Sequence, residues 1–187
     1  MEYLPRFDCG KIKELADRYT SCQNEKDRKA EGRIEELVGP TVKKTGYYSK
    51  EHFLDLCHWK TPRTQPRCTA NDEQFICEVT ELALKTTSER LRIEVLTLLD
   101  GVGWPTASVL LHFGHLEDYP ILDFRALWSL SIPEPKGEYR FSFWWDYLLI
   151  CRTIAKKCGV TMRTLDRALW QFSADQPSTT AGASTST

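Results

Sequence analysis

The sequence contains no apolar stretch approaching the roughly 18 residues that a membrane-spanning helix needs. Its first ten residues, MEYLPRFDCG, also lack the basic region followed by an apolar region that marks a secretory signal peptide. We therefore expect a protein that has no membrane partner and resides in the cytoplasm.

The chain also lacks an excess of charge of either sign, since 25 basic and 26 acidic residues give a net charge of −1. Such a chain exerts no global attraction on nucleic acid, which argues against tight nonspecific binding. One local exception is the run CHWKTPRTQPRCTA, residues 57–70, which holds Lys60, Arg63 and Arg67 and no acidic residue. Local contact with nucleic acid therefore stays open.

Cysteine pairs of the CxxC type are absent, and the one conceivable ligand group, Cys57, His58, Cys68 and Cys77, has spacings that match no common zinc module. The cysteines form an odd, scattered set, and without a secretory signal they are expected to be free thiols rather than a disulfide framework. They are Cys9, Cys22, Cys57, Cys68, Cys77, Cys151 and Cys158. We expect no bound metal.

No strand pattern of convincing length occurs, so the expected fold class is all-α. The 187 residues, 41% of them hydrophobic, are enough for one buried core. Apolar residues at helical spacing predict about eight helices in a single domain, residues 1–174, with a helix–hairpin–helix unit at about 88–115. Residues 175–187 have no apolar content with which to fold and are expected to form a disordered tail.

Polar residues that can cap helices predict where several helices begin. Ser49, Ser88 and Thr161 are suited to the N-cap position, and Asn71 or Asp72 is expected to begin another helix. On the two helices before the hairpin, the residues expected to face inward are Phe75, Val79, Leu82, Ala83, Leu91, Val95 and Leu98.

Glycine and proline predict where helices stop. Gly39-Pro40 is expected to end the charge-dense N-terminal helix, and TPRTQPR, residues 61–67, is expected to be a loop. The helix that opens at Pro105 is apolar on most sides, so we expect it to lie in the middle of the fold.

The stretch LLDGVGWPTASVLLHFG places Gly101 and Gly103 between two helical patterns. Both glycines can adopt positive φ angles, so the bend can be tight and its amide groups can face outward. These amides lie at the N-terminus of the Pro105 helix, where unpaired donors and the helix dipole favour an anion such as phosphate. A tight turn between helices without any ligand is the alternative.

The string LLxGVGxxTAxxxL followed by PILD resembles the helix-hairpin-helix DNA glycosylase superfamily, which contains endonuclease III and the adenine mismatch glycosylase. The resemblance is firm over residues 91–130; upstream, FLDLCHWKTPR resembles the helix and loop that carry the family's DNA-inserting residues. It implies a glycosylase-like helical fold and double-stranded DNA as the partner. Gly101, Val102 and Gly103 would hold a backbone phosphate, often helped in this family by a monovalent cation bound to hairpin carbonyls, and Asp123 would be the catalytic carboxylate.

Three departures from the family pattern bear on the reaction. The bifunctional members carry a Schiff-base lysine where this chain has Pro105, so the resemblance implies a monofunctional reaction. Asp100 stands where proline is usual, and its charge either weakens phosphate binding or points away. Only Cys151 and Cys158 lie in the C-terminal half, so the iron–sulfur cluster of endonuclease III, and with it any cofactor, is not expected.

Several further side chains are candidates for DNA contact. Trp59, Lys60 and Arg63 would fill the gap left by an extruded base and grip the DNA, although Trp59 fits a core position and Lys60 a solvated surface equally well. The other candidates are Trp104 beside the hairpin, Thr106 in the first helical turn and Arg125 after Asp123, where Arg125 contacts either DNA or a neighbouring acid.

Asp123 is both a good N-cap for the helix FRALW and a suitable group to stabilise the cationic sugar formed when a base departs. The leading hypothesis is a monomeric, monofunctional DNA glycosylase in which Asp123 lies across one cleft from the bend at 101–103. The alternative is a non-catalytic helix-hairpin-helix module that binds DNA or a protein. A third hypothesis is an unrelated helical interaction protein whose GVG turn is incidental.

Overall fold

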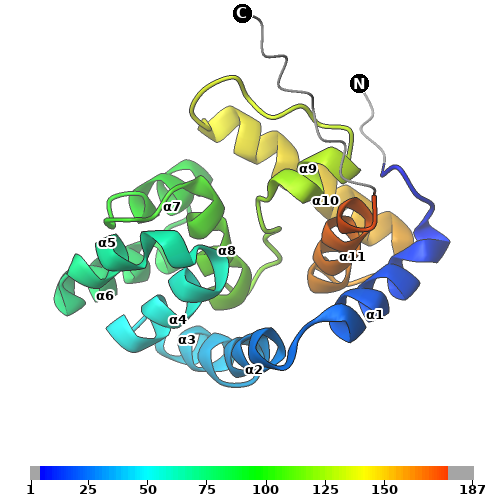
Figure 1. Ribbon diagram of the computed structural model, residues 1–187. Helices are drawn as coiled ribbons and strands as arrows, with labels where there is room; N and C mark the ends of the chain where they lie inside the picture. Colours follow the sequence, from blue (N-terminus) through cyan, green and yellow to red (C-terminus); the bar gives the residue numbers. More distant parts are fainter. Residues whose placement is uncertain (1–4, 177–187) are drawn as a thin grey trace, which may run out of the picture.

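The computed structural model describes residues 5–176, and every regular element in that range is helical. The all-α prediction is confirmed, with shorter and more numerous helices than the eight expected. None of these helices combines the length and apolar character of a membrane-spanning segment. In chain order they are α1 (Ile12–Cys22), α2 (Glu25–Arg33), α3 (Gly39–Thr45), α4 (Lys50–Lys60), α5 (Gln65–Ala70), α6 (Glu73–Lys85), α7 (Glu89–Leu96), α8 (Trp104–Gly114), α9 (Phe124–Ser129), α10 (Phe141–Cys158) and α11 (Met162–Ala174) (Figure 1).

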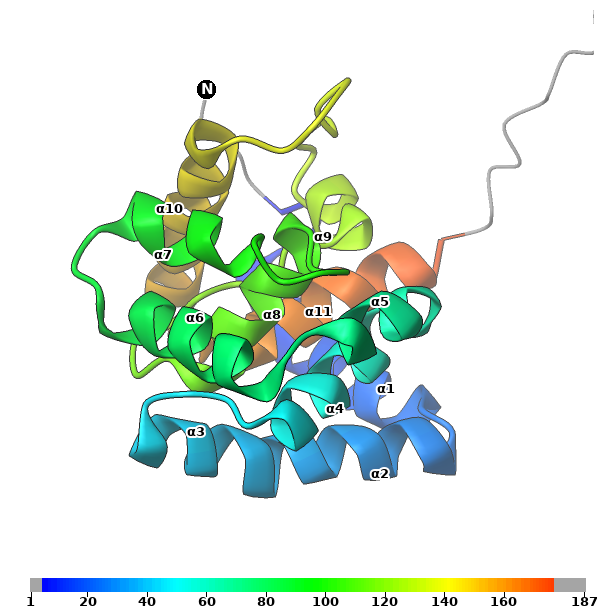
Figure 2. The same cartoon turned by 90° about the vertical axis from the view of Figure 1, so that its left-hand side faces the viewer.

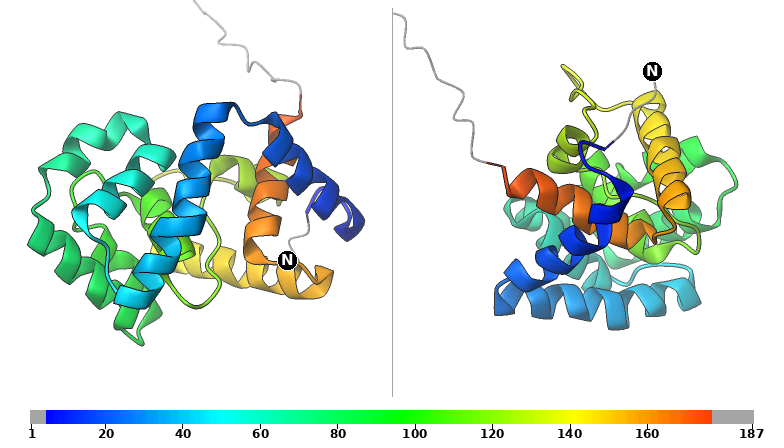
Figure 3. Two further views of the ribbon diagram at one scale, coloured as in Figure 1. Left: turned by 90° about the horizontal axis from the view of Figure 1, so that it is seen from below. Right: turned by 90° about the vertical axis from the view of Figure 1, so that its right-hand side faces the viewer.

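The helices form two groups that meet along α2 (Figure 1). In the first group α8 is the central helix: most of its residues are buried, and it packs against α3, α4 and α7 (Figure 2). This confirms the predicted interior position of the Pro105 helix, which follows from its having almost no polar side. In the second group α11 packs against α1, α9 and α10 (Figure 3).

The prediction that Gly39-Pro40 ends a helix is wrong. The chain stays helical from α2 through a π-helical segment, η2 (Ile34–Val38), into α3, and Pro40 lies in the first turn of α3. The π segment shifts the hydrogen-bond register just before the proline, so the missing N–H of Pro40 falls where a new helix begins. Gly39 also allows close packing, since a Cβ there would lie 3.2 Å from the carbonyl oxygen of Phe113 in α8.

The prediction that residues 61–67 form a loop is also wrong. Pro62 opens a short 3₁₀ turn, η3 (Pro62–Thr64), and Pro66 lies in the first turn of α5. Both prolines therefore occupy positions where a backbone N–H would have no helical partner, so they begin helices instead of breaking them.

The predicted N-caps are confirmed, whereas the predicted buried faces of α6 and α7 are confirmed only in part. Ser49, Ser88 and Thr161 each accept a hydrogen bond as N-cap, and Asp72 rather than Asn71 caps α6. The residues Val79, Ala83 and Val95 are buried as expected, but Phe75, Leu82, Leu91 and Leu98 are exposed. Both helices carry more apolar residues than the buried face holds, so spacing alone left the orientation of that face undetermined.

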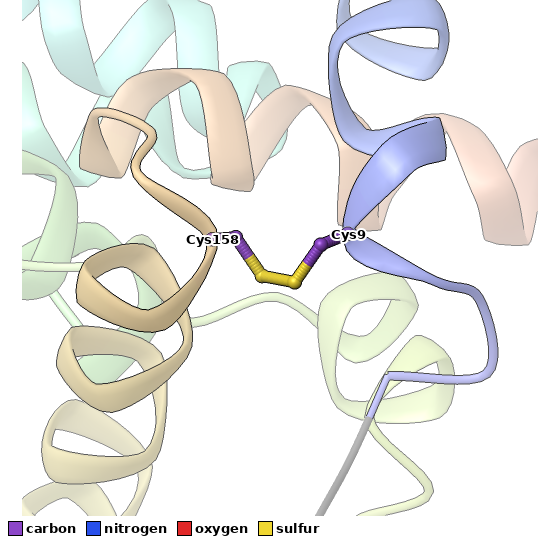
Figure 4. Close-up of a disulfide and its surroundings, with 2 residues drawn as sticks. All are labelled: Cys9 and Cys158. Carbon is purple, nitrogen blue, oxygen red and sulfur yellow. A yellow bond between two sulfur atoms is a disulfide. The ribbon is translucent and has the colours of Figure 1, made fainter.

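The expectation that all cysteines are free is wrong for Cys9 and Cys158, which form a disulfide across 149 residues (Figure 4). Cys158 is the last residue of α10 and Cys9 begins η1 (Cys9–Lys11), so the bond fastens the N-terminal segment to the second group of helices. Spacing cannot reveal a pairing made by tertiary folding. Because disulfides are rare in the cytosol, this bond lends no support to the predicted cytoplasmic location.

Candidate functional site

Asp123 occupies the N-cap of α9, as its position before FRALW predicts. Its Oδ1 atom accepts the Arg125 backbone N–H at 2.9 Å, and its Oδ2 atom accepts a hydrogen bond from Nζ of Lys60 at 2.7 Å. Lys60 is the last residue of α4, so this ion pair joins the two groups of helices. Both side chains remain partly accessible, at 12% exposure for Lys60 and 17% for Asp123.

The segment that delivers Asp123 is anchored from both sides. The backbone N–H of Leu122 donates to Oγ of Ser108 in α8 at 2.8 Å. The hydroxyl of Tyr147 in α10 donates to the carbonyl oxygen of Ile121 at 2.7 Å. Since both groups are buried, these bonds fix the position of the carboxylate that follows.

Asp123 and Lys60 line a cleft of about 550 Å³ between the two groups of helices. One wall is the end of α4 with Pro62; the opposite wall comes from the end of α1, the start of α2 and one face of α11. The side chains in these walls are Tyr19, Cys22, Gln23, Asn24, Lys26, Asp27, Ala30, His58, Trp59, Ile121, Asp166, Trp170, Gln171 and Ala174. The volume lies within the range of about 300–1,000 Å³ that is usual for sites that bind small molecules.

Asp166 of α11 brings a further carboxyl to the cleft. Burial raises its pKa to about 6, with a further contribution from the negative charge of Asp123, while the Arg163 guanidinium at 2.6 Å and Lys60 oppose the rise. Asp123 and Asp166 are therefore two carboxyls of one cleft in different environments, a pattern typical of acid–base sites.

An ion network lies behind Asp166 and ties α11 to α2 and η2. Arg163 and Arg167 both contact Glu31, at 2.7 and 2.5 Å, and both contact Glu35, at 2.7 and 2.8 Å. Glu31 is buried, and although burial raises its pKa, the two arginines and the hydroxyl of Tyr19 lower it to below the usual range. The network stiffens the cleft wall from which Asp166 projects.

The GVG bend is shaped by its packing against α5. Gly101 has a φ of +83°, and a Cβ at this position would lie 2.7 Å from Sγ of Cys68 and 3.0 Å from its backbone nitrogen. The fold therefore requires glycine at 101. Val102 is buried, and its N–H donates to the carbonyl oxygen of Leu99 at 3.0 Å, so its side chain faces the core.

Gly103 differs from Gly101 because the fold does not require it. Its φ of −97° suits any residue, it is exposed, and a Cβ there would meet only Cδ of Pro105 at 3.8 Å. Gly103 is the N-cap of α8, and Trp104 in the first turn is half-buried. A glycine that packing does not demand leaves the start of α8 unobstructed for a ligand.

The bend and Asp123 do not share the cleft, contrary to expectation: within residues 5–176, the residues lining it include none from 101–103. Thr106 of α8 is buried, and its hydroxyl lies 3.4 Å from that of Thr61, the residue after Lys60. The end of α4 therefore separates the bend from the cleft, with Lys60 facing Asp123 and Thr61 facing the start of α8.

The basic segment lies against the bend. Arg63 and Arg67 are exposed on η3 and α5, and a Cβ at Gly101 would lie 3.1 Å from Cβ of Arg67. Arg67 thus starts beside the bend that precedes the exposed N-terminus of α8, and a cation near a helix N-terminus suits phosphate.

Trp59 lines the cleft, and Arg125 lies beside the cleft residue Trp170. The Trp59 ring packs edge-on against Phe113 at 5.7 Å and lies 5.5 Å from the Arg163 guanidinium, so it serves both core and cleft wall. Arg125 lies over the rings of Phe124 at 5.2 Å and Trp170 at 5.0 Å, and within residues 5–176 it forms no ion pair with an acid.

The sequence analysis did not identify Asp166 as a residue of the cleft or Arg67 as a neighbour of Gly101. Asp166 sits on the amphipathic helix TMRTLDRALW, where an acidic residue suggests only a solvated face. Arg67 was visible as part of the basic segment, but its place beside Gly101 depends on α5 being a helix.

Residues 5–176 contain no group of three or more His, Cys, Asp or Glu side chains arranged to hold a metal ion. Two of the hairpin carbonyl oxygens already accept hydrogen bonds, that of Leu99 from the Val102 N–H and that of Asp100 from the Asn71 side chain. We therefore derive no step that uses a cation.

Comparisons with protein-family models, with curated proteins and with solved structures found no match to this chain.

Proposed function

We propose that this protein is a DNA glycosylase-like enzyme that binds duplex DNA as a monomer and hydrolyses the N-glycosidic bond of a base extruded into the cleft. The observation that carries the proposal is the position of Asp123: a partly accessible carboxylate in a cleft of about 550 Å³, next to the end of α4, where Thr61 contacts Thr106 at the start of α8. The helix-hairpin-helix glycosylase resemblance of residues 91–130 agrees with this arrangement.

DNA binding would use the surface outside the cleft. A phosphate at the start of α8 would meet the exposed backbone of Gly103 and the nearby Arg67, with Arg63 contacting a neighbouring phosphate. The end of α4 would then follow the DNA backbone into the cleft, where Trp59 and Trp170 offer aromatic surface for an extruded base.

The reaction would use two carboxyls, one that is ionised and one that is partly protonated. Ionised Asp123 stabilises the positive charge that develops on the sugar as the base departs, or orients the attacking water. Asp166, with its pKa raised to about 6, retains a protonated fraction near neutral pH and supplies a proton to the leaving base.

The second candidate is a non-catalytic DNA-binding module, which one observation favours. Both oxygens of Asp123 are engaged, Oδ1 by the Arg125 backbone N–H and Oδ2 by Lys60. In this function Asp123 and Lys60 would only connect the two groups of helices, and the bend would provide the binding surface.

A base-release assay separates the two candidates. Labelled duplexes that carry uracil, hypoxanthine, 8-oxoguanine or an alkylated base are incubated with protein and then treated with hot alkali, which cuts the strand wherever a base is missing. The enzyme produces alkali-dependent breaks with at least one duplex, and Asp123→Asn, which keeps the helix cap, reduces them about 100-fold or more.

Binding measured in parallel completes the test. The binding module is favoured if the protein retains DNA in a salt-sensitive way, Gly103→Asp abolishes this retention, and no base is released from any duplex. If neither base release nor retention occurs, both candidates are rejected.

A further inference from the structure

The outer face of α9 carries two large aromatic side chains that the core covers only in part. Phe124 is 58% exposed and Trp128 is 38% exposed. They lie four residues apart in the sequence, so both rings are on one face of the helix. Large aromatic rings that lie together in solvent mark a surface that another molecule contacts.

A hollow of about 560 Å³ lies beside these rings, and both Phe124 and Trp128 line it. The turn after α9 shapes this hollow. Ser131 has a φ of +57°, its N–H donates to the Trp128 carbonyl oxygen at 3.0 Å, and the Ile132 N–H donates to the Leu127 carbonyl oxygen at 2.9 Å. This pair of bonds is a Schellman motif, which ends the helix and returns Ile132 to the hollow.

Two arginines lie over the exposed rings. The Arg6 guanidinium is 4.1 Å from the centre of the Trp128 ring, and its Nε atom donates to the Trp128 carbonyl oxygen at 2.8 Å. The Arg125 guanidinium is 5.2 Å from the centre of the Phe124 ring. Within residues 5–176 neither guanidinium forms an ion pair with an acid, so both positive charges can meet an anionic ligand.

Trp170 connects this face of α9 to the cleft. The Arg125 guanidinium is also 5.0 Å from the centre of the Trp170 ring, and Trp170 lines the cleft that contains Asp123. Rings and guanidinium groups therefore alternate from the cleft to the hollow. We refer to Arg6, Phe124, Arg125 and Trp128 together as the α9 face.

We propose that the α9 face binds single-stranded nucleic acid. Unpaired bases stack on Phe124, Trp128 and the planar guanidinium groups, while Arg6 and Arg125 contact phosphates of the strand. A single strand can present the flat faces of its bases, whereas a duplex keeps them stacked on one another, so exposed rings select the single strand. The inference goes beyond the proposed function, because it uses neither the bend nor Asp123 and requires no removal of a base.

The charge of the α9 face favours a polyanion over a second copy of this chain. In a dimer with two-fold symmetry the same surface meets itself, so Arg6 and Arg125 would approach the same two arginines of the second copy. Of the residues lining the hollow within 5–176, Glu134 is the only acid, and its Oε1 atom accepts a hydrogen bond from the Tyr139 hydroxyl at 3.1 Å. One such carboxylate in each copy cannot neutralise four guanidinium groups.

The test measures fluorescence anisotropy of the full chain with three labelled probes of about 15 nucleotides. These are oligothymidylate, oligouridylate and a DNA duplex of mixed sequence. The wild type should bind the single strands with an affinity that falls as salt rises. Binding of either single strand supports the inference, and the ratio of the two affinities shows whether DNA or RNA is preferred.

Two substitutions of Phe124 test stacking directly. Phe124→Leu keeps an apolar side chain but removes the aromatic ring, and it should weaken single-strand binding by about fivefold or more. Phe124→Trp keeps a ring and should bind within about twofold of the wild type, or more tightly. Leu149→Ala, at a 43% exposed position of α10, is the control and should leave the affinity unchanged.

The arginines and the bend are tested separately. For single strands, Arg6→Gln and Arg125→Gln should each reduce the slope of log affinity against log salt by about 0.7, the value for one phosphate contact. Gly103→Asp, which alters the proposed duplex surface, should leave single-strand binding unchanged. Circular dichroism confirms that each variant folds.

The inference is overturned if the wild type binds neither single strand, or if Phe124→Leu binds them as tightly as the wild type does. It is also overturned if light scattering shows a dimer that excludes the strand, because the α9 face would then be a contact between copies of this chain. Single-strand binding that depends on Phe124, without base release from any duplex, would uphold this inference while the proposed glycosylase activity fails. Base release without single-strand binding would give the opposite result.

Discussion

The side chain of Asn71 and the main chain of Asp100 exchange two hydrogen bonds: Nδ2 donates to the Asp100 carbonyl oxygen at 2.9 Å, and Oδ1 accepts the Asp100 N–H at 2.8 Å. Asn71 is buried, and its Nδ2 atom also donates to the carbonyl oxygen of Cys68 at 2.9 Å. One amide thus joins the end of α5 to the start of the GVG bend, so the basic segment and the bend are held as one unit.

Replacing Asn71 by alanine should destabilise the protein. The substitution removes this set of buried hydrogen bonds and leaves the Asp100 N–H without its partner, which should lower the free energy of unfolding by about 2–3 kcal/mol. Urea unfolding followed by circular dichroism measures the change. Gln74→Ala, at an exposed position of α6, is the matched control, and an equal effect of the two substitutions would contradict the role of Asn71.

Gly101 and Gly103 should respond oppositely to alanine. At Gly101 the left-handed backbone and the collision with Cys68 should lower the free energy of unfolding by about 2–4 kcal/mol. At Gly103 the fold accommodates a methyl group, so stability should change by less than about 0.5 kcal/mol while DNA affinity falls. Thermal unfolding and filter binding measure the two effects, and Gly137→Ala, where a Cβ meets no atom within 4 Å, is the control.

An unchanged DNA affinity in Gly103→Ala would contradict a phosphate site at the start of α8. A stability loss at Gly103 equal to that at Gly101 would show that both glycines serve only the turn.

Local features of the fold could be predicted from the sequence because neighbouring residues determine them. The caps Ser49, Ser88, Asp123 and Thr161 needed only a short polar side chain before an amphipathic run. The interior position of α8 followed from its lack of a polar face. These interactions span a few residues, which is the distance over which sequence patterns are informative.

The site itself depended on contacts between distant segments. Lys60 and Asp123 are 63 positions apart, and their pairing requires α4 and the segment before α9 to meet. Asp166 reaches the same cleft only because α11 packs against α1 and α9. A local sequence pattern contains no information about contacts between such distant segments. The position of Arg67 could not be predicted because Pro62 and Pro66 begin helices instead of ending them.

The exposed arginines beside the bend should govern the salt dependence of DNA binding. If each neutralises one phosphate, Arg63→Gln and Arg67→Gln should each reduce the slope of log affinity against log salt by about 1, at similar cost for every DNA sequence. Fluorescence anisotropy between about 50 and 200 mM salt measures the slope. Lys156→Gln, at an exposed position of α10, should leave it unchanged, and equal slopes for all variants would place the DNA elsewhere.

Asp166 should make stability depend on pH. Its pKa is raised from 3.8 to about 6 in the folded protein, mainly because burial disfavours its charge. The folded state therefore holds this proton more tightly than the unfolded chain. The contribution of Asp166 to the free energy of unfolding should consequently fall as the pH rises from about 4 to about 6, by on the order of 2–3 kcal/mol, and stay constant above.

Asp166→Asn removes this titration while its amide oxygen can still accept from Arg163. The stability of the variant relative to the wild type should therefore increase across that pH interval, as measured by urea unfolding at half-unit steps. Asp146→Asn, at an exposed position of α10, is the matched control for the loss of one carboxylate. Parallel stability curves for Asp166→Asn and the wild type would mean that the Asp166 carboxyl is ionised throughout, and it could then not act as the proton donor in the cleft.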